Sequence, residues 1–192
     1  VCSSDLDLFK SKLNQLDFHD HEGLCATEHG LYSLTRIAFD LNYWNTGTAR
    51  SIVKQQHVYY VGGYGPLKYF TLNDFAIHES APLNNYYAFL PLSRDTTLVG
   101  LEGNFLGLLV HGKFSSLYYK KAKGVIEDLS TMVYSLCQYR DGNYLVGTSC
   151  GIWVYDRDTG IVSPLRDKMG KLVGMGERIN SIQLRGQIIS FT

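Results

Sequence analysis

Residues 141–160, DGNYLVGTSCGIWVYDRDTG, hold two short runs of alternating apolar residues between turn-forming ones. Asp, Gly and Asn tolerate the backbone conformations of tight turns, whereas Val, Ile, Tyr and Trp favour extended strands. The pattern predicts two antiparallel strands. It leaves open whether they form a single hairpin or one copy of a larger repeated unit.

The pattern recurs along the chain. Residues 145–155, LVGTSCGIWVY, align without a gap with residues 24–34, LCATEHGLYSL. Weaker copies are VYYVGGYGPLKYF at 58–70 and TLVGLEGNFLGLLV at 97–110, and INSIQLRGQIISFT at 179–192 begins a fifth copy. The equivalent small residues are Ala26, Gly62, Gly100, Gly147 and Ser190, separated by roughly 36 to 47 residues, a spacing typical of propeller blades.

The repeated unit predicts a fold. Each interval holds four short runs of period 2 and no helical stripe. In the fourth copy the runs are Met132 to Tyr139, Tyr144 to Ser149, Gly151 to Asp156 and Ile161 to Leu165. We therefore predict an all-β protein: a β-propeller fragment of about four and a half four-stranded antiparallel blades, truncated at both ends. The predicted blades cover residues 12–41, 49–79, 86–119 and 132–165, with a partial blade at 178–192.

The first six residues, VCSSDL, match the translation of a common sequencing adapter. We expect residues 1–6 to be an artefact of sequencing and the propeller fragment to occupy residues 7–192. A signal segment ahead of residue 7 would then have been lost, so its absence says nothing about location.

Composition excludes several partners. The 18 basic and 18 acidic residues give no net charge, and the longest basic run is KKAK at 120–123, so we expect no nucleic acid partner. The longest apolar run, 105–110, is too short to span a bilayer, and no membrane contact is expected from this fragment. Cys25, Cys137 and Cys150 lack C-x-x-C spacing, so neither a disulfide framework nor a zinc site is predicted.

The fourth copy resembles the two-component regulator propeller repeat, in which a D-G turn precedes a Gly-Thr strand, a Gly-Ile pair, a Tyr-Asp pair and a Thr-Gly turn. The matching residues are Asp141, Gly142, Gly147, Thr148, Gly151, Ile152, Tyr155, Asp156, Thr159 and Gly160. The match departs at Tyr144 and Leu145, where the family usually has Trp. The first copy keeps Thr27, Gly30 and Leu31 but has Ala26 in place of Gly.

This resemblance implies the extracytoplasmic, periplasmic sensor region of a membrane-spanning signalling protein, often a hybrid histidine kinase of bacteria that use polysaccharides. It implies a non-enzymatic region that senses a small molecule or an oligosaccharide, and a homodimer in the full-length receptor. A histidine kinase module would lie outside this chain.

Three motifs that suggest other chemistry have simpler interpretations. GLLVHGKFS at 107–115 fits the spacing of a phosphate-binding loop, but Phe114 stands where that loop needs Ser or Thr. HDHE at 19–22 falls on a predicted hairpin turn. Glu102, Glu127 and Asp128 read as surface charges. We predict no catalytic residues, no metal site and no cofactor.

Ligand contacts are expected in the loops on one face of the propeller, from second to third strands and from each blade to the next. The candidates are Asn42, Tyr43, Trp44, Asn45, Glu28, His29, Tyr64 and Glu102. Trp44 beside Asn42 and Asn45 in a predicted loop is the first choice for a sugar ring, because an aromatic plane and amides suit stacking and hydrogen bonding. Packing on a neighbouring blade is the more common role for such a residue.

Two alternatives remain open at this point. A propeller enzyme, such as a glycoside hydrolase or lyase, would use acidic residues and His29 around a central channel. A protein-interaction scaffold would use the same loops to hold a partner.

Overall fold

A computed structural model of the chain describes residues 13–19, 22–35, 41–44, 47–71, 76–80, 83–125, 132–140 and 142–192. The described residues form strands, turns and connections, with no helix among them. The described part of the chain therefore contains no helix that could span a membrane. The chain divides into two compact units, Val1–Tyr86 and Tyr87–Thr192.

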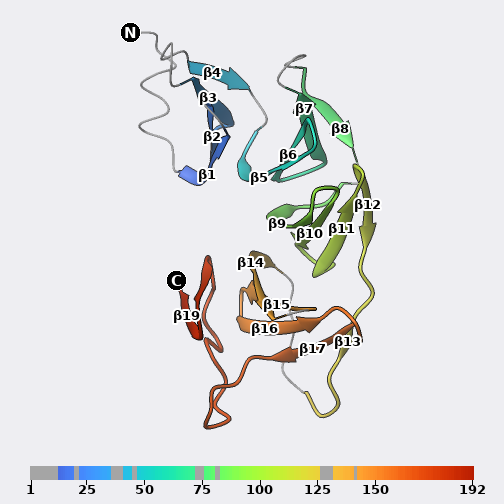
Figure 1. Cartoon of the computed structure of the whole chain (residues 1–192), viewed down its shortest axis with the longest axis vertical. Coiled ribbons are helices and arrows are strands. Elements are labelled where there is room, and N and C mark those ends of the chain that lie inside the picture. Colours follow the sequence, from blue (N-terminus) through green and yellow to red (C-terminus); the bar gives the residue numbers. More distant parts are fainter. Residues whose placement is uncertain are drawn as a thin grey trace. The chain divides into compact units, whose positions relative to one another are not determined.

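The first unit contains two antiparallel four-stranded sheets, each in simple up-and-down order (Figure 1). The first sheet consists of β1 (Leu13–His19), β2 (Glu22–Thr27), β3 (Leu31–Thr35) and β4 (Leu41–Trp44). The second consists of β5 (Ala49–Gln55), β6 (Val58–Gly63), β7 (Leu67–Thr71) and β8 (His78–Ser80). Their facing sides share one buried cluster, which includes Leu24, Ile52 and Phe70. Alternating apolar side chains on these strands therefore form the interface between two sheets.

The second unit repeats this arrangement. One sheet consists of β9 (Tyr86–Ser93), β10 (Thr96–Leu101), β11 (Leu106–Val110) and β12 (Lys113–Ser116). The next contains β14 (Val133–Arg140), β15 (Asn143–Thr148), β16 (Gly151–Asp156) and β17 (Ile161–Pro164). Trp153 is fully buried among residues of both sheets, including Leu98 and Leu106. Trp153 therefore serves packing between sheets, as its place on an alternating strand predicts.

Two short elements complete the second unit. The hairpin of β18 (Ile182–Arg185) and β19 (Ile188–Phe191) packs on the opposite face of the β14–β17 sheet through a second cluster that includes Leu145, Ile152 and Ile182 (Figure 1). β13 (Lys120–Lys121), part of the connection after β12, pairs in parallel with β17. It covers the outer edge of that sheet, which would otherwise leave backbone groups unpaired.

Side chains at one repeated position tie neighbouring sheets together. In the first unit the Gln15 amide donates to the carbonyl oxygen of Ile52 at 3.0 Å and accepts from its N–H at 2.8 Å. In the second unit the Ser135 hydroxyl donates to the carbonyl oxygen of Ile179 at 3.2 Å. Gln15 and Ser135 lie opposite the small residues Ala26 and Gly147 in their ladders. The polar side chain therefore reaches the neighbouring sheet beside a small residue, which leaves room for the contact.

Close packing explains Gly147. A Cβ atom at this position would overlap the Ser135 hydroxyl and lie 2.8 Å from Cγ2 and 3.0 Å from the carbonyl oxygen of Ile179. The small residue predicted at this point of the repeat is thus required by the approach of the next sheet.

The strand pattern and the antiparallel sheets agree with the sequence analysis, but two details were wrong. Residues 42–44 belong to β4, which pairs with β3 through Leu31 and Trp44, instead of lying in a loop. The Tyr and Trp of this segment favour a strand once a partner strand is present, and this outweighs the turn tendency of Asn. Ser190 is also two residues out of register: it lies opposite Gln183, whereas Thr192 pairs with Ser181 as Gly147 pairs with Ser135.

Candidate functional site

A β-bulge recurs at the point where the chain enters the first strand of a sheet. The ladders between first and second strands are interrupted between Leu13 and Gln15, between Ala49 and Ser51, and between Val133 and Ser135. One residue is left out of the ladder each time: Asn14, Arg50 and Tyr134. We call these the bulge residues. A bulge redirects the extra side chain away from the alternation of the strand, which is why bulges often occur beside functional sites.

In the first unit the bulge residue Arg50 meets a loop residue of the same sheet. Its guanidinium donates to the hydroxyl of Tyr64 at 2.6 Å and lies 4.9 Å from the centre of the Tyr64 ring. Tyr64 directly follows β6 and is 51% exposed. The predicted ligand-contacting residue Tyr64 therefore belongs to a cation–aromatic pair at the surface.

A corresponding pair occurs in the second unit. The Tyr87 hydroxyl donates to Oε2 of Glu102 at 2.8 Å, and Glu102 directly follows β10 as Tyr64 follows β6. Tyr87 is buried, whereas Glu102 is half-buried. The backbone of Glu102 forms a bridge with Met132, which enters the next sheet. The predicted residue Glu102 is therefore held at both its side chain and its backbone.

Glu102 and Tyr87 continue into a row that joins three neighbouring sheets. The rings of Tyr87 and Tyr134 lie 5.6 Å apart at 31°, and the guanidinium carbon of Arg178 lies 4.1 Å from the centre of the Tyr134 ring. We call Glu102, Tyr87, Tyr134 and Arg178 the aromatic row. Glu102 was singled out from the sequence. The two tyrosines were missed, because both lie on the first strands of their sheets, where sequence alone suggests packing.

The predicted residues Glu28 and His29 occupy the tip of a tight turn in the first unit. The Thr27 hydroxyl donates to the carbonyl oxygen of Gly30 at 2.9 Å and accepts from the N–H groups of His29 and Gly30, both at 3.2 Å. Glu28 and His29 are exposed. The turn presents both side chains to solvent.

The same turn closes β15 and β16 in the second unit. The Thr148 hydroxyl donates to the carbonyl oxygen of Gly151 at 2.9 Å and accepts from the N–H of Cys150 at 3.1 Å. Gly151 has a φ of 121°, and a Cβ there would lie 3.0 Å from the carbonyl oxygen of Gly174. This contact docks the segment before Arg178 against the turn.

The remaining predicted ligand contacts are only partly described. The backbones of Asn42, Tyr43 and Trp44 form β4, and Asn45 lies outside the described residues. Their role in binding stays a prediction.

The structure tests one of the three motifs with simpler interpretations directly. Residues 107–115 form a strand, a two-residue turn with positive φ at His111 and Gly112, and a second strand, so the segment lacks the helix of a phosphate-binding loop. β1 ends at His19 and β2 begins at Glu22, while residues 20–21, Glu127 and Asp128 lie outside the described part.

Cysteine chemistry is not favoured at the site. Cys25, Cys137 and Cys150 are free thiols. Burial raises the pKa of the Cys25 and Cys137 thiols, which disfavours the thiolate that a nucleophile or a metal ligand needs. Within the ranges that the structure describes, no three His, Cys, Asp or Glu residues cluster as metal ligands do.

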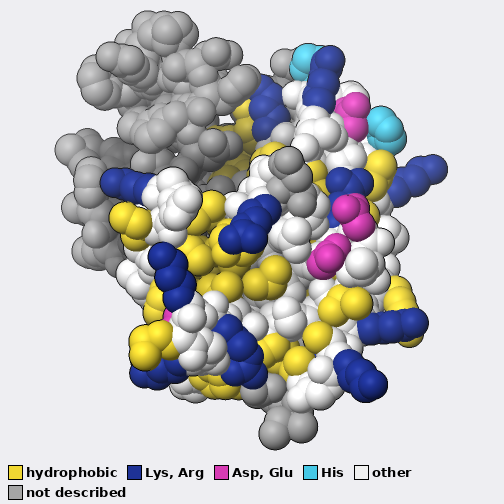
Figure 2. All heavy atoms as spheres, turned by 60° about the horizontal axis from the view of Figure 1, so that its bottom comes forward, with side chains coloured by type: hydrophobic (Ala, Val, Ile, Leu, Met, Phe, Trp, Pro, Cys, Tyr) yellow, Lys and Arg dark blue, Asp and Glu magenta, His cyan; other side chains and the backbone are white. Residues whose placement is uncertain are grey.

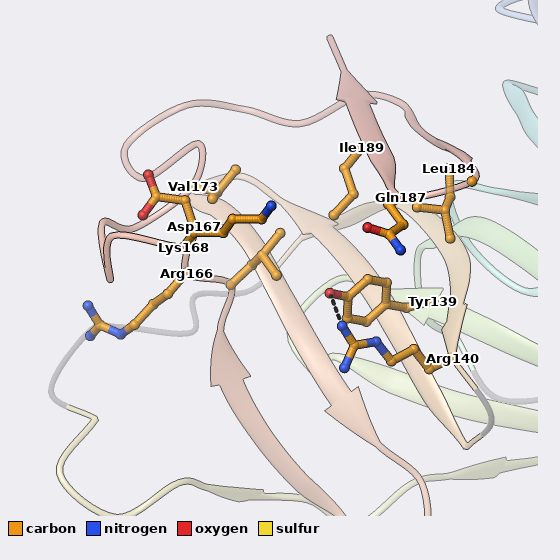
Figure 3. Close-up of a pocket in the computed structure, with 11 residues that line it drawn as sticks. Tyr139, Arg140, Arg166, Asp167, Lys168, Val173, Leu184, Gln187 and Ile189 are labelled. Atoms are coloured by element: carbon orange, nitrogen blue, oxygen red, sulfur yellow. Dashed lines mark hydrogen bonds between the residues drawn. The ribbon is translucent and has the colours of Figure 1, made fainter.

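A cavity of about 850 Å³ lies elsewhere in the second unit, between the β14–β17 sheet and the β18–β19 hairpin (Figure 3). Leu165, Val173, Leu184 and Ile189 contribute apolar lining that continues the core between these sheets. Lys168 points toward Gln187, whereas Asp167 points away and accepts hydrogen bonds from the backbone of its own loop. Polar and charged residues make up much of the remaining lining: Tyr139, Arg140, Arg166, Asp167, Lys168 and Gln187.

Charge is dispersed on the surface that Figure 2 draws. Lys and Arg side chains there stand apart, with hydrophobic and other side chains between them, instead of forming one continuous stripe. A site on such a surface is defined by local groups more than by a long-range field. The aromatic row offers an acceptor, Glu102, and a donor, Arg178, at the two ends of one rigid set of side chains.

Comparison with known proteins identifies the fold. No known protein family matches the sequence, and no curated protein matches it. Among solved structures, the extracellular domain of BT4673 from B. thetaiotaomicron, described as a one-component system, has a TM-score of 0.72 at 18% identity, over 94% of this chain and 26% of that chain. A structure of the same domain described as a hybrid two-component system has a TM-score of 0.69 at 19% identity, over 92% and 25%.

WD40 propellers are similar as well. The WD40 domain of Neurospora crassa Pan2 has a TM-score of 0.61 at 10% identity, over 92% of this chain and 56% of that chain.

The chain spans about a quarter of the length of the BT4673 domain. These similarities confirm the all-β propeller fold and the expected structural likeness to the extracellular domain of a two-component system protein. The number of blades stays a prediction.

Proposed function

We propose that this chain is a ligand-sensing part of a membrane-spanning signalling receptor and that its ligand is an oligosaccharide or a related nutrient. The ligand binds in the second unit, at the aromatic row that includes the bulge residue Tyr134. Binding changes the population of receptor arrangements, and segments outside this chain carry the change across the membrane. The fold similarity to the extracellular domains of signalling proteins supports an extracytoplasmic, periplasmic location.

The aromatic row is the observation that carries this proposal. It places a carboxylate, two tyrosines and a guanidinium in sequence across three sheets that pack against one another. Hydroxyl groups of a sugar pair well with such alternating acceptors and donors, and a rigid scaffold lowers the entropy lost on binding. The bulge lets Tyr134 join the row without disturbing the ladder on either side of it.

A binding role accounts for these contacts better than catalysis does. The Tyr87 hydroxyl occupies one oxygen of Glu102, and the Tyr134 hydroxyl donates to the sulfur of Met132 at 2.9 Å. Groups that hold one another in this way are suited to positioning a ligand. A glycoside hydrolase would instead need two carboxyl groups facing a scissile bond.

Isothermal titration calorimetry against a panel of oligosaccharides, with product analysis of the same mixtures, tests the proposal. We expect saturable binding without turnover. Tyr134→Ala should weaken binding at least about tenfold, because it removes the centre of the row. Tyr139→Ala is the matched control. Tyr139 lies on the same strand as Tyr134, but at the opposite end of that strand, where it lines the cavity.

Three results would contradict this proposal. Cleavage of a bound oligosaccharide would identify an enzyme. Loss of binding in Tyr139→Ala alone would move the ligand to the cavity. A gene assembled beyond both ends of this sequence that encodes a secreted protein without a membrane helix would exclude a receptor.

A further inference from the structure

Arg178 has donor groups that the described part of the protein leaves available. Its side chain is exposed, and its contact there is with the ring of Tyr134. No described residue accepts a hydrogen bond from it or pairs with its charge. A guanidinium group carries five N–H donors in a planar fork, and contact with an aromatic ring uses none of them.

The backbone around Arg178 is fixed by its neighbours. The N–H of Ile179 donates to the carbonyl oxygen of Thr148 at 2.9 Å, and the N–H of Glu177 donates to that of Gly174 at 3.0 Å. Ile179 is fully buried. Arg178 therefore extends from an anchored segment, so less freedom is lost when its donors engage a ligand than for a mobile surface arginine.

The ring of Tyr134 already contacts two side chains, those of Tyr87 and Arg178, which leaves less of it open to a sugar ring. Tyr87 comes from the sheet that packs on one face of the β14–β17 sheet, and Arg178 precedes the hairpin that packs on the opposite face. The row thus presents charged and polar edges to a ligand instead of an open aromatic plane. This differs from the ring-stacking site expected around Trp44.

We infer that the aromatic row recognises an oligosaccharide that bears an acidic group, with the carboxylate or sulfate bound by Arg178. This inference rests on the proposed function and names the class of its ligand. A planar guanidinium pairs with two oxygens of a carboxylate or sulfate at once, which gives both strength and a defined orientation. Glu102 at the other end of the row accepts hydrogen bonds from sugar hydroxyls and repels a second acid, so the ligand binds in one direction.

Titration of the whole 192-residue chain with three tetrasaccharides tests this inference: one of hexuronates, one of sulfated neutral hexoses and one of unmodified neutral hexoses. We expect the acidic oligomers to bind roughly 10- to 100-fold more tightly than the neutral one, the range for a charge-assisted hydrogen-bonded pair. Preference between the first two identifies the acidic group as carboxylate or sulfate.

Arginine variants give the matched comparison. Arg178→Gln should remove the preference for the acidic oligomers, and Arg178→Lys should restore part of it because the charge returns without the fork. Arg140→Gln is the control, because the guanidinium of Arg140 also lies over a tyrosine, Tyr139, at 4.7 Å, but beside the cavity. It should leave the preference unchanged.

The failures of the two proposals are distinguishable. Equal affinity for neutral and acidic oligomers, unchanged by Arg178→Gln, would overturn the acidic ligand and leave the sensing function standing. Binding of none of the oligomers in the wider panel, with the fold verified by circular dichroism, would overturn both. An equal loss in Arg140→Gln would assign the preference to overall charge and overturn the role of Arg178.

Discussion

Tyr86 illustrates how a single buried group couples stability to pH. It is fully buried at the start of β9, and burial raises its pKa from 10.0 to about 12. In the unfolded chain the phenol ionises near pH 10, whereas the folded chain keeps its proton until about pH 12. The stabilisation is therefore fully present below about pH 10 and is lost as the pH rises toward 12.

Urea unfolding between pH 9 and pH 11.5 checks this expectation. The free energy of unfolding should fall with rising pH above 10, and Tyr86→Phe should make that fall shallower because the phenol no longer titrates. Tyr60 and Tyr155, whose pKa values are also raised by burial, account for a remaining slope. Tyr118→Phe, at a residue that is 77% exposed, is the matched control for the loss of a tyrosine hydroxyl. An unchanged slope in Tyr86→Phe would show that another group is responsible.

At the scale of an element, the Thr-x-x-Gly turn explains why two distant segments align without a gap. Thr27 and Thr148 are both fully buried, and each hydroxyl closes its turn by bonding to the carbonyl oxygen three residues later. The side chain replaces backbone hydrogen bonds that a tight turn leaves unmade. Sequence similarity at these positions therefore reflects the hydrogen bonding of a turn.

Replacing Thr148 by Val keeps the shape of the side chain and removes its hydroxyl. The carbonyl oxygen of Gly151 and the N–H of Cys150 then lose a partner, and we expect unfolding to become easier by about 1–3 kcal/mol. Thr159→Val is the control, since Thr159 is exposed and accepts a longer bond of 3.3 Å. Chemical denaturation of both variants gives the comparison. If Thr148→Val lowered the free energy of unfolding no more than the control does, water would be replacing the hydroxyl.

The elements also mark where sequence reasoning succeeded and where it stopped. Turn residues and alternation predicted the strands around Gly147 and Trp153, because those signals are local. The bulges were not predicted: Asn14, Arg50 and Tyr134 share no residue type, and the extra residue becomes visible only when two strands are paired. β13 was missed for a similar reason, since its two lysines become a strand only by pairing with β17.

The candidate site was predictable only in part. Glu102 and Tyr64 were named because they follow a second strand, and the structure pairs each with a residue of its own sheet. Those partners, Tyr87 and Arg50, lie on first strands, where sequence alone suggests packing. A contact between residues of different strands depends on register, which alternation does not specify.

At the scale of the whole molecule, each of the two units has buried clusters of its own. Val61 and Val146 occupy the same position in their sheets, one residue before the small residues Gly62 and Gly147, and both are buried. Val61 belongs to the cluster of the first unit and Val146 to a cluster of the second. Sheets that pack only on their neighbours are stabilised mainly by local contacts.

Hydrogen exchange can measure how far a local change spreads. Val61→Ala and Val146→Ala should each cost about 2 kcal/mol from lost methyl groups and the cavity left behind. We expect Val61→Ala to speed exchange mainly in β2 and β5–β7, and Val146→Ala mainly in β10, β11 and β14–β17. A uniform increase over all sheets in both variants would instead indicate one cooperative unit.

The recurring bulge separates the alternation that the fold requires from the choice of side-chain chemistry, two demands that usually conflict. The residues of a ladder must keep their alternation, so most substitutions there disturb the fold. The strand pairing skips one residue at each bulge: Asn14, Arg50 and Tyr134. Their side chains differ in kind, being an amide, a cation and an aromatic ring. Selection can therefore exchange the chemistry at these positions one sheet at a time, while the architecture that holds them stays the same.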